Sequence, residues 1–391
     1  MSYRMLKADY LFDGFKMLTG VVLVITSDGT IESIIDEKSA GTDPEIFSGI
    51  LSPGFINCHC HLELSHLKGL IAEKQGLVNF VLSVMSQRNQ PEELKRQAMT
   101  TAETAMLAAG IVAVGDICNT ADSRIQKSEN NLPYYDFIEL LGWMPGQAEA
   151  RFESGRRLAD LFKEEGQDEN HLALTPHAPY SVSEDLWNRM IPGFKGKTIT
   201  IHNQESAAEN EFFSTAGGDL TRMYSRMNIV SDHFKAPGST SLSFFLPKLK
   251  TASKILLVHN TFMNEADVLL TKSFGEDIYL CLCPNANLYI EDRIPNIPLF
   301  VNHKASVVLG TDSLASNHQL SILEEIKTIR KAFPAIPGAE LLKWATSNGA
   351  TALSFDEKLG DFTTGKKPGI VLIENLINGE IGAGSKCRRI L

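Results

Sequence analysis

The sequence predicts an α/β fold, namely a (β/α)8 TIM barrel with a small β-sandwich domain formed by both termini. Short apolar segments recur eight times between residues 54 and 312, and amphipathic segments separate most of them. The two flanks of the chain carry short strand-like runs and no long helical pattern. Eight alternating strand and helix units over roughly 260 residues are typical of such a barrel.

The eight apolar segments have the composition of buried parallel strands. They are almost continuously apolar and rich in β-branched residues, as expected for strands that helices cover. In chain order they are GFINCHCH (54–61), GIVAVGDI (110–117), YYDFIELLGW (134–143), HLALTPH (171–177), KTITIHN (197–203), KILLVHN (254–260), DIYLCLCP (277–284) and ASVVLGTD (305–312).

Three segments between these strands are clear helices. Residues 91–109 begin with Pro and two acidic residues and stop before Gly110. Residues 147–166 also end in Gly, and residues 320–333 are amphipathic with basic residues near their end.

The flanks of the chain show strand-like runs and no long helical pattern. Residues 1–52 and 357–391 are therefore expected to form one β-sandwich domain, with the barrel of residues 53–356 inserted between its halves.

Composition and charge exclude several classes of partner. The chain has 391 residues and a net charge of −10, so it offers no general attraction to nucleic acid or anionic lipid. No targeting signal and no apolar run long enough to span a bilayer is evident, and six cysteines are too few for a disulfide scaffold. We expect a cytoplasmic protein with a small-molecule substrate.

Two histidines share one face of the first predicted strand. Alternate residues of a strand point the same way, so His59 and His61 face the barrel interior while Cys58 and Cys60 face the helices. Other predicted strands also end in titratable residues, and the carboxyl ends of barrel strands meet at one mouth. These residues are His177, His202, His259 and Asp312.

This set of residues predicts a metal centre. Neutral imidazoles and a carboxylate suit Zn²⁺ or Fe²⁺, and His59, His61, His202 and Asp312 make a four-ligand set. Strand four offers His177 instead of a bridging anion, so we expect one divalent metal, Zn²⁺ first and Fe²⁺ as the alternative.

The neighbours of these ligands predict hydrolysis. A bound metal lowers the pKa of water to about 7. Asp312 can then accept a proton, Glu205 can relay one to a substrate ring nitrogen, and His259 can hold the attacking oxygen. Glu205 could also stabilise a helix N-terminus, and His259 could be a hydrogen-bonded core histidine.

Seven motifs carry a family resemblance. They are PGFINCHCH (53–61), PHAPYS (176–181), HNQES (202–206), HN (259–260), CPNANLYI (283–290), LGTDSLASN (309–317) and ATSNGATAL (345–353). The chain resembles the metal-dependent amidohydrolase superfamily, in its deaminase and chlorohydrolase (triazine hydrolase-like) branch. The resemblance implies a single zinc or iron on His59, His61, His202 and Asp312, with Glu205 and His259 as proton-transfer residues.

Further motifs narrow the resemblance to deaminases of adenine nucleosides. HLELSHL (61–67), SLSFFLP (241–247) and LASN (314–317) are most similar to deaminases of 6-amino-6-deoxyfutalosine and S-adenosylhomocysteine. The implied reaction attacks the amino-bearing ring carbon of an aminopurine nucleoside and releases ammonia. Relatives commonly pair, which implies a homodimer. The candidate substrate contacts are His177, Glu63, His66, Ser316 and Asn317; the last four could equally be solvated loop residues.

Two other functions stay open. The same ligands would serve a hydrolase that opens a cyclic amide, imidazolone or triazine ring, and an inactive scaffold could share the fold. A zinc cytidine deaminase is excluded, because it requires H-x-E followed by P-C-x-x-C, whereas residues 281–284 read CLCP.

Overall fold

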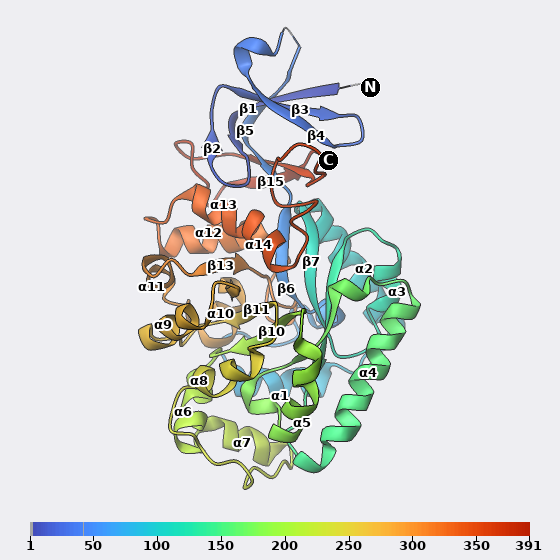
Figure 1. Ribbon diagram of the computed structural model, residues 1–391, viewed down its shortest axis with the longest axis vertical. Coiled ribbons are helices and arrows are strands. Elements are labelled where there is room, and N and C mark those ends of the chain that lie inside the picture. Colours follow the sequence, from blue (N-terminus) through green and yellow to red (C-terminus); the bar gives the residue numbers. More distant parts are fainter. Residues whose placement is uncertain (1–2, 42) are drawn as a thin grey trace.

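The computed structural model describes residues 3–41 and 43–391, and it confirms the predicted barrel (Figure 1). Eight parallel strands form two four-stranded sheets, in the orders β6-β7-β8-β9 and β10-β11-β12-β13. Their bounds are β6 Phe55–Cys60, β7 Ile111–Cys118, β8 Tyr134–Leu140, β9 Leu172–Pro176, β10 Thr198–Asn203, β11 Lys254–His259, β12 Ile278–Leu282 and β13 Ser306–Leu309.

Two seams join the sheets into a closed barrel. At one seam the backbone N–H groups of Thr311 and Asp312 donate to the carbonyl of His59, each at 3.0 Å. The Asn57 side chain also donates to Thr311 Oγ1 at 2.8 Å. At the other seam the His202 N–H donates to the His177 carbonyl at 2.9 Å. The bonds that close the sheet therefore involve four of the predicted site residues.

The three helices expected from the sequence begin and end within two residues of the structure's α2, α4 and α12. Figure 1 shows α1, α6 and α7 at the end of the molecule opposite the terminal strands. The helix bounds are α1 Leu77–Gln87, α2 Glu92–Ala108, α3 Arg124–Ser128, α4 Ala148–Glu164, α5 Glu184–Met190, α6 Ala207–Thr215, α7 Asp219–Arg226, α8 Ser241–Phe245, α9 Glu265–Phe274, α10 Pro284–Glu291, α11 Ile297–Asn302, α12 Ile322–Ala332, α13 Gly338–Ala345 and α14 Ser347–Ala352.

Both ends of the chain contribute to a separate seven-stranded sheet, ordered β15-β14-β5-β1-β3-β4 with β2 beside β1. Strand β5 pairs with β1 in parallel and with β14 antiparallel, which ties the amino-terminal strands to the carboxyl-terminal ones. The domain division at 1–52 plus 357–391 and 53–356 stays a prediction. The strand bounds are β1 Tyr3–Phe12, β2 Met17–Leu18, β3 Val21–Thr26, β4 Ile31–Asp36, β5 Glu45–Pro53, β14 Ile370–Glu374 and β15 Lys386–Arg389.

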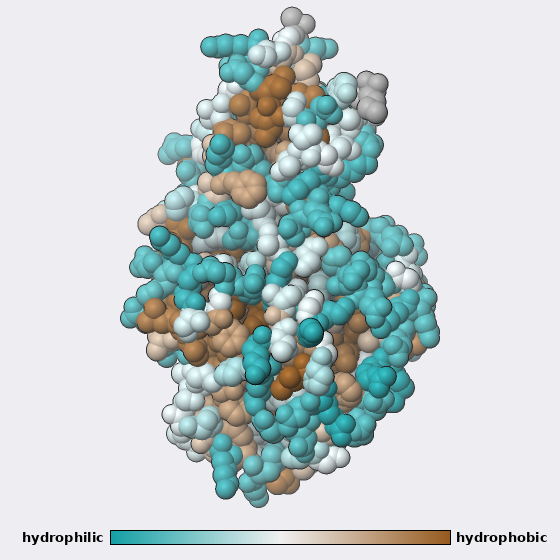
Figure 2. All heavy atoms as spheres, viewed as in Figure 1, coloured by the Kyte–Doolittle hydropathy of each residue, from teal (hydrophilic) through white to brown (hydrophobic). Residues whose placement is uncertain are grey.

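Apolar side chains fill the space between the barrel strands and their helices, and every residue of β6, β7, β8, β10 and β12 is buried. Hydrophilic residues cover most of the face seen in Figure 2, with apolar patches over the terminal sheet and among the barrel helices. Among the described residues, no helix is both long enough and apolar enough to cross a bilayer.

Candidate metal centre and active site

Three histidines and one aspartate converge at the carboxyl ends of β6, β10 and β13. The Nε2 atoms of His59 and His61 lie 3.2 Å apart. Asp312 Oδ1 lies 3.6 Å from the first and 3.4 Å from the second. Nitrogens of His59, His61 and His202 lie within 4.8 Å of one another, and all four side chains are buried.

The spacing of these atoms fits a single tetrahedral ion. Ligands about 2.0–2.1 Å from zinc stand about 3.3 Å apart along a tetrahedral edge. The three short separations, 3.2, 3.4 and 3.6 Å, bracket that length.

The local backbone brings these side chains together. Asp312 lies three residues beyond the end of β13 and has φ +57°, a left-handed conformation that is uncommon outside glycine. His259, the last residue of β11, has φ +73°. Strain of this kind is typical of functional sites. Gly310 is needed for a different reason, because a Cβ there would lie 2.7 Å from His59 Cβ.

Burial keeps four of the histidines at this site neutral, the form that binds a metal. Burial lowers the pKa of His202 and of His177 to about 4. It also holds the pKa of His61 and His259 well below the ordinary value. Burial alone would raise the pKa of Asp312, but contact with His59 and His61 lowers it below the usual range, so this carboxylate is ionised.

Hydrogen bonds orient two of these histidines. His202 Nδ1 lies 2.8 Å from the His177 carbonyl oxygen, to which it donates, so its Nε2 is free to face the metal position. His177 itself is hydrogen-bonded to Ser181 Oγ at 2.8 Å, and its ring centre lies 4.8 Å from that of His202.

Glu205 and His259 lie beside the ligand set. Glu205 Oε1 is 3.6 Å from His259 Nε2, and both side chains are buried. Burial, with Asp312 and Glu291 nearby, raises the pKa of Glu205 well above the ordinary value. A carboxyl group with a raised pKa can hold a proton near neutral pH. The Asn287 amide lies 3.2 Å from His259 Nδ1 and fixes the ring.

The predicted substrate contacts differ in their surroundings. Glu63 is buried, which raises its pKa to about 7, and Glu63 Oε1 has no hydrogen-bond partner among the described residues. His66 is instead hydrogen-bonded to the carbonyls of Glu63 and Arg88.

Two of these candidates lie behind the metal ligand. Ser316 Oγ donates to Asp312 Oδ2 at 2.5 Å, and Asn317 donates to the Thr311 carbonyl at 2.8 Å. The structure thus gives His66, Ser316 and Asn317 partners within the protein, and their contact with substrate stays a prediction.

Sequence reasoning missed two polar residues at the barrel mouth. Glu139 Oε1 lies 3.4 Å from His202 Nδ1, and Asn287 holds His259 as described above. Glu139 was not predicted to lie at the barrel mouth, because the third strand was expected to run to residue 143. In the structure β8 ends at Leu140, which places Glu139 at its carboxyl end. The rule that identified the histidines would have found this glutamate.

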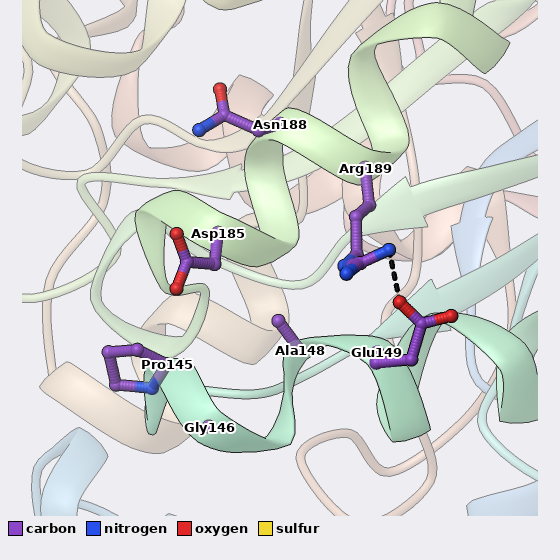
Figure 3. A pocket seen from close by; sticks show the side chains of 7 residues that line it. All are labelled: Pro145, Gly146, Ala148, Glu149, Asp185, Asn188 and Arg189. Atoms are coloured by element: carbon purple, nitrogen blue, oxygen red, sulfur yellow. Dashed lines mark ion pairs between the residues drawn. The ribbon is translucent and has the colours of Figure 1, made fainter.

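A separate hollow of about 430 Å³ lies between the start of α4 and α5 (Figure 3). Figure 3 shows Glu149 and Arg189 paired across it, with Asp185 and Asn188 nearby. None of the predicted ligand or catalytic residues lines this hollow. The predicted site residues lie elsewhere, at the carboxyl ends of the strands.

Comparison with known proteins gives one family. The chain matches the amidohydrolase family over residues 50–386. An aminodeoxyfutalosine deaminase from Nitratiruptor sp. is 25% identical over 357 residues, covering 88% of this chain and 84% of that protein. A 5-methylthioadenosine/S-adenosylhomocysteine deaminase from Thermococcus onnurineus is 25% identical over 377 residues, covering 90% and 82%.

A solved structure shows the same fold. The crystal structure of Helicobacter pylori aminofutalosine deaminase in complex with methylthio-coformycin has a TM-score of 0.80 with this chain at 24% identity. The match covers 96% of this chain and 94% of that one. The similarity thus extends over the barrel and the terminal sheet together.

Proposed function

Because this chain belongs to the amidohydrolase family, we propose that it is a metal-dependent hydrolytic deaminase of an aminopurine nucleoside. Its substrate class is that of 6-amino-6-deoxyfutalosine, S-adenosylhomocysteine and adenosine. The observation that carries the proposal is the tetrahedral spacing of the imidazole and carboxylate atoms, with the buried Glu205 and His259 side chains beside them. The names of the two deaminase relatives support the choice of nucleoside.

His59, His61, His202 and Asp312 would hold the ion, with Zn²⁺ preferred over Fe²⁺. When bound, such an ion polarises water and lowers its pKa to about 7, which supplies a nucleophile at neutral pH. Ser316 holds Asp312 Oδ2, so Oδ1 is the atom that faces the histidines. Asp312 thereby presents one oxygen to the centre in a fixed orientation.

Glu205 supplies the proton that a purine ring needs. Addition of water to the amino-bearing carbon is favoured when the adjacent ring nitrogen is protonated, and Glu205 carries a proton because burial raises its pKa. His259 Nε2, 3.6 Å from Glu205 Oε1, would hydrogen-bond the oxygen that adds to this carbon. The proton that Asp312 accepts from the attacking water passes to the amino group, so that cleavage of the carbon–nitrogen bond releases ammonia and leaves the keto purine.

The remaining parts of the proposal concern binding and assembly. His177 and Glu63 are the substrate contacts that the geometry favours. The half-buried His177 ring lies 4.8 Å from that of His202, and the buried Glu63 follows the ligand His61 by two residues. His66, Ser316 and Asn317 remain weaker candidates. We also propose a cytoplasmic homodimer, in which each chain binds one small-molecule substrate.

Ammonia release from a panel of nucleosides tests the function. The zinc-loaded protein is incubated with adenosine, 5′-deoxyadenosine, S-adenosylhomocysteine and 6-amino-6-deoxyfutalosine, and with a cyclic amide and a triazine. The proposal expects ammonia and the 6-keto product from at least one nucleoside, and release at least about 100-fold slower from the Glu205→Gln variant. Opening of the cyclic amide with no nucleoside turnover would favour the ring hydrolase instead.

A further inference from the structure

A fully buried lysine lies at the centre of an acidic cluster behind the barrel mouth. Lys127 of α3 places its Nζ 2.6 Å from Asp116 Oδ2 and 2.5 Å from Asp136 Oδ1. The same nitrogen is 3.1 Å from Cys118 Sγ. No side chain of these four is more than 1% exposed. Asp116, Cys118 and Asp136 could by residue type hold a metal, but the ammonium of Lys127 already occupies the centre of this cluster.

The second oxygen of Asp116 connects this cluster to the metal centre. Asp116 Oδ1 accepts the backbone N–H of Leu62 at 2.8 Å. Leu62 follows the predicted ligand His61 and is the first residue of the 3-10 helix Leu62–Leu67. The first N–H groups of a helix have no partner within the helix, so an outside acceptor must satisfy this one. Asp116 therefore fixes the chain immediately after His61.

We propose that Lys127 is a positioning residue for the metal centre: its ammonium holds Asp116 in place, and Asp116 in turn holds the Leu62 N–H, His61 and Glu63. This inference rests on the metal site of the proposed function. The chemical reason is that two buried carboxylates side by side cannot both stay ionised and ordered without a cation. Without the lysine, Asp116 and Asp136 repel each other, Asp116 turns toward another donor, and the His61 segment loses its anchor.

The environment of Lys127 supports a charged and immobile ammonium. Burial disfavours the charge, but Asp116 and Asp136 more than compensate and raise the pKa of Lys127 well above the ordinary value. The nitrogen also lies 4.8 Å from the centre of the Tyr134 ring and 5.1 Å from that of Phe162. The lysine is therefore surrounded by groups that prefer a cation.

Metal affinity measured without substrate tests this inference. Lys127→Met removes the charge and keeps the length of the side chain. Its Co²⁺ dissociation constant, measured against a chromophoric chelator, should rise 10- to 100-fold, the usual loss when a partner behind a metal ligand is removed. The visible spectrum of bound Co²⁺ should also change, because His61 no longer has a fixed position.

Two further variants separate positioning from simple stabilisation. Asp116→Asn combined with Lys127→Met should restore Co²⁺ affinity to within about threefold of wild type, since the amide oxygen still accepts the Leu62 N–H and requires no cation. Asp136→Asn is the matched control, because it damages the same cluster but leaves the Asp116–Lys127 pair. Its melting temperature should fall while its Co²⁺ affinity stays that of wild type.

Several results would overturn the inference. Wild-type Co²⁺ affinity in Lys127→Met would do so, as would an equal loss of Co²⁺ affinity in Lys127→Met and Asp136→Asn. The inference also fails if Asp116→Asn, added to Lys127→Met, does not restore Co²⁺ affinity. If Lys127→Met does not fold, Asp116→Ala and Asp116→Asn are compared with Lys127 intact, and equal Co²⁺ affinities contradict the role of Asp116. Since only Co²⁺ is used, a failed deaminase assay leaves this test unaffected.

Discussion

Glu209, a buried acid next to the active site, gives a stability prediction that can be worked out in numbers. It lies in the first turn of α6 and is fully buried. Glu209 Oε1 accepts the Gln204 N–H at 2.9 Å and the Ser241 hydroxyl, whereas Oε2 has no hydrogen-bond partner among the described residues. Burial raises the pKa of this carboxyl from 4.5 to about 7.

The direction and the size of the change in the free energy of unfolding follow from proton linkage. A carboxyl whose pKa is raised in the folded state contributes stability that is complete below pH 4.5 and is lost as the pH rises through 7. Between pH 5 and pH 8 this loss amounts to about 2.5 kcal/mol for such a pair of pKa values. Glu209→Gln abolishes this titration. The free energy of unfolding of the variant, relative to that of wild type, should therefore rise by about 2.5 kcal/mol from pH 5 to pH 8.

Melting curves at pH 5, 6, 7 and 8 measure the effect. For a chain of 391 residues, about 2.5 kcal/mol corresponds to a change of about 3 °C in the melting-temperature difference between variant and wild type. Any constant cost of the glutamine amide cancels in this comparison. Glu211→Gln, at an exposed position on the same helix, serves as the control and should show no such trend. A melting-temperature difference that is constant from pH 5 to pH 8 would refute the reasoning.

Three other outcomes are expected. Glu205→Gln should retain the metal but lower kcat by about 10²- to 10⁴-fold, because a proton donor is lost; kcat within threefold of wild type would contradict that role. Gly310→Ala should weaken metal binding at least tenfold, since the new Cβ would displace His59, and equilibrium dialysis checks this. Incubation with a strong chelator should abolish ammonia release and Zn²⁺ should restore it, whereas chelator-resistant turnover would exclude a metal-dependent reaction.

Much of the barrel and of the metal site could be predicted because both depend on short-range patterns. The alternation in residues 54–61 placed His59 and His61 on one face, and the shared direction of parallel strands brought His202 and Asp312 to the same mouth. The structure places all four together. Asp312 lies three residues beyond the end of β13, where it has a left-handed backbone and forms a single parallel bridge to Cys60.

The parts that could not be predicted depend on contacts between distant residues. The bond from Asp116 to the Leu62 N–H joins residues 54 positions apart, and no local pattern indicates it. Lys127 occurs in a short polar segment that looks solvent-exposed in sequence, yet α3 turns it into the interior. The order of the terminal sheet is likewise set by tertiary pairing, because β5 has different partners on its two edges.

The most direct test of the central claim is a crystal structure of the zinc-loaded protein with anomalous scattering at the zinc edge. The account predicts one zinc peak per chain, about 2.0–2.2 Å from a nitrogen of each of His59, His61 and His202 and from an oxygen of Asp312. A zinc peak elsewhere, or one that Asp312, His59 and His61 do not share, would contradict it.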